Sequence, residues 1–353
     1  MNLEGDALSS PFFWNFRSMY SNVRGTIFAL ACLSSFVFAQ TLPSIPQRDR
    51  IRLAEAFRVM DRFGDRIWNE WNDAPFAVVL VTPKTEFLLR NPKPTPDFQS
   101  LGFDSLLGSV VYARPRTFPT DLLATFPAVN GVLTIVIGQA ENTEAKESSR
   151  WVLTMLHEHF HQVQYSRPGY YSGLKDLNLD KGDQTGMWML NFPFPYDSVD
   201  VYREFGLVAQ KLQEAILSPR PEFRYRLNRY RSFRSELNGM LTPDQNRYLA
   251  FQLWQEGIAR YTELEMAALI AREYIPTEAF QSLDDYVPFG VELDKVRFGT
   301  ISEIGNLSLK ELHRTAFYSF GASEGILLNR CNPRWREEYF SHPFSLEQLF
   351  PDK

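Results

Sequence analysis

The chain has 353 residues, of which 44% are apolar and 14% aromatic, and this composition supports one large or two medium folded domains. It excludes a disordered chain. The formal net charge of -5 at pH 7 gives no electrostatic reason to expect a nucleic acid or an anionic membrane surface as partner. We therefore expect a mildly acidic globular protein.

Residues 1–39 have the three regions of a secretory signal peptide. Arg24 precedes an apolar run from Ile27 to Phe38, and Ala39 offers a small residue before a cleavage point. The run has about a dozen residues, fewer than the roughly 20 that cross a bilayer as a helix, so we expect cleavage rather than permanent anchoring. The segment that precedes the apolar run is unusually long, and translation from Met19 would shorten it. An exported protein, secreted or periplasmic and without a stable membrane span, is expected.

The two cysteines are placed unequally. Cys32 lies inside the expected leader, so Cys331 would be the single cysteine of the mature chain, and no internal disulfide is possible. We expect Cys331 to be a buried or inert thiol rather than a nucleophile. The reason is that each histidine that would have to activate it has a better explanation or no positional support.

Strand-forming runs come first in the mature chain. An amphipathic helix is expected to open it at 51–71, and Pro75 to end that helix. Strands are expected at 76–82, 107–113 and 132–137. A strand-rich part at 40–165 would therefore end in the helix described next.

Helical patterns dominate the rest of the chain. A helix is expected from an N-cap at Ser148 through Gln164, and a long irregular loop at 168–195. Further helices are expected at 201–217, at 221–240, from a capping box at Thr242 to beyond Ile270, and at 309–329. Strands followed by helices indicate an α+β fold, with a mainly helical part at 166–353.

His157, Glu158 and His161 form the pattern H-E-x-x-H within the helix at 148–164. On a helix, His157 and His161 lie one turn apart on one face, so both imidazoles can reach a single cation. Glu158 points about 100° around the helix, near enough to take a proton from a metal-bound water. The alternative is a surface helix with polar histidines. Apolar residues before the motif favour a buried helix instead, and His159 is expected to be a second-layer or rim residue.

A catalytic zinc site needs a third protein ligand and an open position for water. Glu256 is the best candidate, because it lies in a predicted helix next to Gly257, where a missing side chain lets another helix or the metal approach closely. The alternative is a surface glutamate that pairs with Arg260 at i,i+4. Apolar neighbours at Phe251, Leu253 and Ile258 favour the ligand.

H-E-x-x-H followed on a later helix by E-G-x-A resembles the gluzincin branch of the zincin metallopeptidases. The resemblance implies a zincin-like fold, Zn2+ bound by His157, His161 and Glu256, and Glu158 as general base. It implies a peptide or protein as substrate. The two motifs carry the whole resemblance, and residues 162–255 form a longer spacer than the best-known members have.

Members of this family also stabilise the oxyanion with a tyrosine or histidine from a helix beyond the third ligand. Tyr318 and His313 are the candidates, and Tyr318 is preferred because a tyrosine keeps its proton at neutral pH. Core packing is the alternative for Tyr318. The family commonly binds the substrate backbone on an edge strand before the metal helix, the position of Gly131–Gly138. Glu141 lies in a stretch that resembles an aminopeptidase signature but lacks its methionine.

Three other patterns have simpler explanations. Gly321-Ala-Ser323-Glu-Gly325 matches G-x-S-x-G but lies in a predicted helix, not at a strand–turn–helix elbow. The stretch 176–182 resembles the start of a calcium loop, but its glycine is one position late and no glutamate closes it. The arginines of 220–234 fit a solvated helix face better than a nucleic-acid site.

The sequence therefore predicts a zinc metallopeptidase. In this hypothesis zinc polarises the carbonyl, Glu158 moves the proton and Tyr318 steadies the oxyanion. Two alternatives stay open: a non-catalytic binding protein with a zincin fold, and a zinc hydrolase of a non-peptide amide or ester. An intact H-E-x-x-H argues against the binding protein, because the base has no duty in a closed zinc site.

Overall fold

The computed structural model describes residues 42–183, 185–302 and 304–351. The expected signal peptide at 1–39 lies outside these described residues. Within them, every helix is too short or too polar to cross a lipid bilayer.

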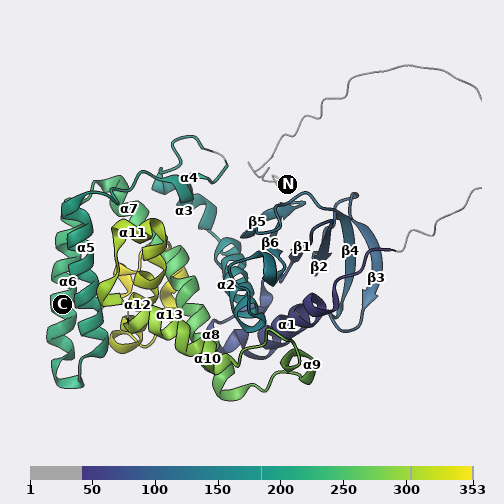
Figure 1. Cartoon of the computed structure of the whole chain (residues 1–353). Helices are drawn as coiled ribbons and strands as arrows, with labels where there is room; N and C mark the ends of the chain where they lie inside the picture. Colours follow the sequence, from purple (N-terminus) through teal and green to yellow (C-terminus); the bar gives the residue numbers. More distant parts are fainter. Residues whose placement is uncertain (1–41, 184, 303, 352–353) are drawn as a thin grey trace, which may run out of the picture.

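One six-stranded mixed sheet forms the first part of the described chain (Figure 1). Its strand order is β3-β4-β2-β1-β6-β5, with β1 and β6 parallel and the other neighbours antiparallel. The strands are β1 (Val78–Val81), β2 (Thr85–Leu89), β3 (Gln99–Asp104), β4 (Ser109–Pro115), β5 (Leu123–Val129) and β6 (Val132–Gly138). The three predicted strands correspond to β1, β4 and β6, whereas β2, β3 and β5 were not predicted.

The prediction that Gly131–Gly138 is an edge strand was wrong. β6 lies between β1 and β5, and β5 is the strand at that edge of the sheet. Asn130 (φ 48°) and Gly131 (φ 72°) join β5 to β6 in a tight turn with two left-handed residues. Such a turn matches the twist of a hairpin, and Asn-Gly is its strongest sequence signal.

Helices make up most of the remainder, so the molecule is α+β as expected. They are α1 (Gln47–Ile67), α2 (Ser148–Ser166), α3 (Tyr170–Leu177), α4 (Trp188–Asn191), α5 (Val199–Leu217), α6 (Arg220–Met240), α7 (Pro243–Gln252), α8 (Ile258–Glu273), α9 (Glu278–Gln281), α10 (Phe289–Arg297), α11 (Leu309–Leu312), α12 (Ala316–Cys331) and α13 (Trp335–Glu338). A π-helical turn, Leu253–Gly257, joins α7 to α8.

Some helix ends differ from the predictions. The first helix ends at Ile67 rather than near Pro75, and the predicted loop at 168–195 contains α3 and α4. Glu147 rather than Ser148 is the N-cap of α2. The Ser148 hydroxyl instead bonds Arg52 and Asp285, because tertiary partners are available to it. At Thr242 both bonds of the predicted capping box are present.

The predicted helix at 309–329 is broken. His313 takes φ 48° and ψ -129°, which ends α11 at Leu312 and lets α12 begin at Ala316. A non-glycine residue with positive φ does not continue an α-helix, so the chain changes direction at this residue.

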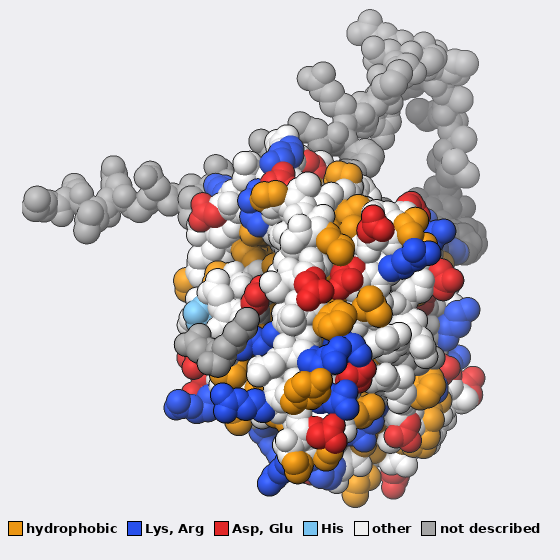
Figure 2. All heavy atoms as spheres, turned by 90° about the vertical axis from the view of Figure 1, so that its left-hand side faces the viewer, with side chains coloured by type: hydrophobic (Ala, Val, Ile, Leu, Met, Phe, Trp, Pro, Cys, Tyr) orange, Lys and Arg blue, Asp and Glu red, His pale blue; other side chains and the backbone are white. Residues whose placement is uncertain are grey.

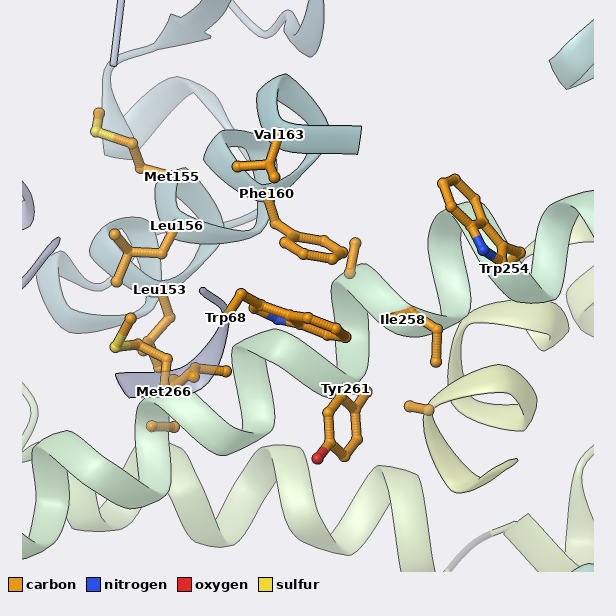
Figure 3. Packing of buried hydrophobic residues seen from close by; sticks show 14 of the residues in the cluster. Trp68, Leu153, Met155, Leu156, Phe160, Val163, Trp254, Ile258, Tyr261 and Met266 are labelled. Atoms are coloured by element: carbon orange, nitrogen blue, oxygen red, sulfur yellow. The ribbon is translucent and has the colours of Figure 1, made fainter. Parts of the chain in front are cut away.

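Helix α2 is buried between the sheet and α8. Leu153, Leu156 and Phe160 of α2 face Trp68 and the α8 side chains in the core (Figure 3). The Trp68 ring stacks on Phe160 with a centroid distance of 5.0 Å, and its indole nitrogen donates to Thr262 at 2.9 Å. Because both faces of α2 are packed, the residues that it carries are held in fixed positions.

The arginines of α6 lie on a charged outer surface, except for Arg234, which is buried and lies 3.5 Å from Glu324. Figure 2 shows the face formed by α5 and α6, where Lys and Arg side chains are interspersed with Asp and Glu. Arg226 bonds Glu222 and Glu214, and Arg231 bonds the Pro351 carbonyl. These internal partners support the interpretation of a solvated helix face.

Candidate metal centre

The side chains of the H-E-x-x-H motif converge at the centre of α2. One potential ligand atom from each of His157, Glu158 and His161 lies within 4.8 Å of the others, and all three residues are buried. From the π-helical turn, Glu256 joins them: its Oε2 atom lies 3.5 Å from His161 Nε2 and 3.9 Å from His157 Nε2. The structure thus brings together four residues that the sequence analysis selected.

These distances fit a shared zinc ion. Zinc binds imidazole nitrogen and carboxylate oxygen at about 2.0–2.2 Å, so two ligand atoms at a tetrahedral angle are about 3.4 Å apart. The observed 3.5 and 3.9 Å differ from that value by only a few tenths of an ångström. Two imidazoles and a carboxylate also form a donor set typical of catalytic zinc.

The amides of Gln164 and Gln255 hold the ring of His161 from its Nδ1 side. The Gln164 Nε2 atom faces the carbonyls of Trp254 and Gln255, at 3.2 and 3.0 Å, and these groups can only accept. Its oxygen must therefore face His161 Nδ1, 2.7 Å away. Gln255 Nε2 lies 2.9 Å from the same Nδ1 atom, so two amides hold that side of the ring, and Nε2 is the nitrogen that faces Glu256.

The π-helical turn makes this arrangement possible. Its wider backbone presents the Trp254 and Gln255 carbonyls to side chains instead of reserving them for a regular helical ladder. Tyr339 also donates to the Trp254 carbonyl, at 2.7 Å. The same amide of Gln164 therefore orients His161 and ties α2 to the turn that carries Glu256.

Replacing Gln164 by leucine is expected to weaken zinc binding about 10- to 100-fold, because His161 loses one of the two amides that orient its ring. Gln162→Leu is the matched control: Gln162 lies on the same helix and bonds His159 and two strand carbonyls, but no ligand histidine. Competition against a chelator of known affinity measures the effect. Equal zinc affinity in the two variants would contradict the role of Gln164.

Glu263 lies behind the other histidine. Its Oε2 atom is 3.6 Å from His157 Nδ1, and its side chain is only 2% exposed. Arg260 pairs with it at 2.7 Å, and Arg150 forms a further short ion pair. Both arginines also line a cavity of about 420 Å3 on the opposite side. The predicted alternative for Glu256, a surface pair with Arg260, is therefore wrong: Arg260 pairs with Glu263.

Thr125 on the edge strand β5 holds Glu158. Its hydroxyl lies 2.8 Å from Glu158 Oε2 and 2.9 Å from the Glu158 carbonyl. One carboxylate oxygen is therefore fixed by the sheet edge, whereas Glu256 faces both imidazole Nε2 atoms. The two carboxylates therefore have different partners beside the imidazole pair.

Tyr318 lies at the centre, and His313 does not. The Tyr318 ring is parallel to that of His157, with centroids 6.1 Å apart, and its hydroxyl accepts from Arg314 at 3.0 Å. Burial and the charge of Glu256 raise the pKa of Tyr318, so the hydroxyl keeps its proton. His313 is exposed and stacks on Tyr196 with centroids 5.0 Å apart.

Negative charge is concentrated around His157. Burial by itself would lower the pKa of His157, but Glu256, Glu263 and Glu158 outweigh it and raise that pKa to about 9. Burial would raise the pKa of Glu256, yet His161, His157 and Arg314 hold it well below its usual range. A field that holds a proton on a buried imidazole also stabilises a cation at the same place.

His159 is not a rim residue, and that part of the prediction was wrong. It is buried, its ring stacks on Phe76 with centroids 4.0 Å apart, and Nδ1 is 2.7 Å from Gln162 Oε1. Burial lowers its pKa to about 3, so the imidazole is neutral. His159 anchors the sheet-facing side of α2 and is not part of the cluster formed by His157 and His161.

The remaining sequence candidates have structural partners. Glu141 forms an ion pair with Arg52 at 3.2 Å. Ser323 is buried within α12 and donates to the Thr300 carbonyl at 2.6 Å, so it is not a nucleophile elbow. Cys331 is a free, partly buried thiol whose pKa burial raises to about 11.

Sequence reasoning missed Thr125, Gln164, Glu263 and Arg314. Asn130-Gly131 signals a hairpin and could have revealed β5 with Thr125. Glu263 follows Glu256 by two helical turns, a spacing that places both on one face. We find no comparable sequence signal for Gln164 or Arg314.

A scan against protein-family models, a search of curated proteins and a search of solved structures each found no match.

Proposed function

We propose that the protein is a zinc-dependent hydrolase with a zincin-like arrangement, and that it hydrolyses peptide bonds. The observation that carries this proposal is the approach of Glu256 Oε2 to the Nε2 atoms of both His157 and His161. Gln164 supports it, because it contacts Nδ1 of His161 and so leaves Nε2 on the side of Glu256.

His157, His161 and Glu256 would hold the ion. When bound, zinc supplies a Lewis acid for the substrate carbonyl and lowers the pKa of a water molecule. Glu158, fixed by Thr125, accepts one proton from the attacking water and returns it to the leaving nitrogen. The water oxygen bonds to the carbonyl carbon, the carbon–nitrogen bond breaks, and Tyr318 donates to the developing oxyanion.

A non-catalytic binding protein is disfavoured by the placement of Glu158. A structural zinc site is closed by its ligands, whereas here two carboxylates, Glu158 and Glu256, accompany the imidazole pair, and Thr125 holds one of them. Hydrolysis of a non-peptide amide or ester would use the same residues, and a substrate panel with matched amide and ester bonds distinguishes these activities.

Removing the metal tests the proposal. A chelator is expected to abolish peptide hydrolysis, and one equivalent of Zn2+ per chain to restore it. His157→Ala and His161→Ala should lose both zinc and activity. His342→Ala is the control, because His342 bonds Gln348 at the surface. Metal content and cleavage of a labelled peptide library are measured together. Stoichiometric zinc without cleavage of any peptide or ester would refute the hydrolase.

A further inference from the structure

Arg314 lies beside the metal centre without a carboxylate of its own. Its Nη1 atom donates to the Tyr318 hydroxyl at 3.0 Å and lies 3.6 Å from Glu256 Oε1. In the described part of the chain, Glu256 is the only acidic side chain within ion-pair distance of this guanidinium. Because Glu256 is also the proposed third ligand, its charge is shared with the ion. With an ion bound, the positive charge of Arg314 would therefore be only partly balanced by Glu256.

The guanidinium has donors to spare. It carries five N–H groups in a planar fork, and Tyr318 is its one hydrogen-bond acceptor among the residues that the structure describes. The side chain is 21% exposed, so the fork is partly desolvated and still accessible to a ligand. A carboxylate matches this fork with two parallel hydrogen bonds.

The charge balance of the centre also favours an anionic ligand. Glu158 and Glu256 together cancel the two charges of a zinc ion, and Arg314 then leaves an excess of positive charge. Glu263 does not correct this excess, because Arg150 and Arg260 already pair with it. A substrate with a negative charge near the reacting bond would restore neutrality.

The neighbourhood of Arg314 offers a second donor. The Tyr196 hydroxyl is buried beside the hydroxyl of Tyr248, which donates to the Met189 carbonyl at 2.9 Å. Burial raises the pKa of Tyr196, while the hydrogen bond with Tyr248 and the charge of Arg314 oppose that rise, so Tyr196 and Arg314 are in electrostatic range. The Tyr196 ring stacks on His313, whose positive φ ends α11 and opens the short 3-10 turn His313–Thr315 that contains Arg314. This turn places Arg314 and Tyr318 four residues apart, on one helical face.

We propose that Arg314 binds the free C-terminal carboxylate of a peptide substrate, and that the enzyme therefore removes single residues from the C-terminus. This inference rests on the hydrolase proposed above and names its substrate class. Arg314 Nη1 is 3.6 Å from an oxygen of the third ligand. Glu256 thus turns Oε1 toward Arg314 and Oε2 toward both imidazoles, so the guanidinium lies one carboxylate group away from the imidazole pair. Because one residue spans about 3.8 Å between Cα atoms, we assign the carboxylate to the residue directly after the reacting carbonyl.

A pair of peptide libraries tests this inference. N-acetylated peptides of mixed sequence are prepared with a free C-terminal carboxylate or with a C-terminal amide, and the zinc-loaded protein is incubated with each. Mass spectrometry is expected to show loss of one C-terminal residue from the acids, about 30-fold faster than any cleavage of the amides. Binding of both forms to the Glu158→Gln protein is measured by calorimetry.

The Arg314→Gln variant should reduce the acid-to-amide ratio to about one, in both cleavage and binding, while Arg314→Lys should restore part of it. Zinc content is measured for each variant, so that a loss of metal is recognised. Arg224→Gln is the matched control, because Arg224 is exposed on α6, and it should keep the wild-type ratio.

The outcomes separate the two proposals. Internal cleavage at equal rates in acids and amides would overturn the carboxylate site while the hydrolase stands. If neither form is cleaved, removal of C-terminal residues is overturned, the metal-removal experiment described above decides on the hydrolase, and the binding measurement decides whether Arg314 is a carboxylate site. Tighter binding of acids that depends on Arg314 supports the site, and equal binding of both forms overturns it.

Discussion

The Glu158→Gln protein is expected to retain one zinc ion per chain and to lose peptide hydrolysis by about 10²- to 10⁴-fold or more. Glutamine has the shape of glutamate and can still accept from Thr125, which bonds Glu158 at 2.8 Å. It cannot take a proton from water, so the chemical step loses its general base while the imidazole pair is undisturbed.

This variant also distinguishes the two carboxylates. Glu158 belongs to the compact group with His157 and His161, so it is a conceivable ligand in its own right. If Glu158 is a ligand, the Glu158→Gln protein should lose zinc. If Glu158 is the base, this protein should keep zinc. Glu256→Gln should show the reverse pattern, with zinc affinity reduced together with activity.

Metal analysis and turnover on one preparation measure both effects. Glu236→Gln, on the exposed side of α6, serves as the control for loss of a carboxylate. Undiminished hydrolysis in Glu158→Gln would refute the base, and loss of zinc from this variant would make Glu158 a ligand.

The sequence could predict the local part of the site. The helical repeat alone places His157 and His161 on one face of α2, and a glutamate followed by glycine pointed to Glu256. The long segment between them did not prevent their meeting, because α2 and the π-helical turn pack in one core and share the bonds of Gln164. The α+β class followed from strands preceding helices.

The sequence could not predict what depends on tertiary partners. Thr125 reaches Glu158 only because β5 pairs with β6 at the sheet edge, and sheet order is not a local property. The break at His313 lies inside a helical pattern, and its backbone angles reflect surrounding contacts rather than local preference. The prediction that His159 is a rim residue failed because its imidazole is buried against the sheet, where Gln162 provides a hydrogen-bond partner.

The close crossing of α12 over the π-helical turn gives the second large expected effect. A Cβ built on Gly257 would lie 2.9 Å from the Gly321 carbonyl carbon, and one on Gly321 would lie 2.7 Å from the Leu253 carbonyl oxygen. Real Cβ atoms almost never come this close, and backbone atoms cannot rotate away. Gly257→Ala is therefore expected to force the helices apart and to cost about 2–3 kcal/mol of unfolding free energy.

Because Glu256 precedes Gly257 directly, the same displacement should move the third ligand and weaken zinc binding. Gly206→Ala is the matched control: Gly206 lies inside α5, and nothing comes within 4 Å of a Cβ built on it. There alanine should stabilise by about 0.5–1 kcal/mol, since it favours the helix more than glycine does. Denaturant unfolding of metal-free protein, followed by a zinc titration, measures both consequences. A Gly257→Ala protein as stable as the wild type would mean that the crossing is looser than described, and that Glu256 is not positioned by it.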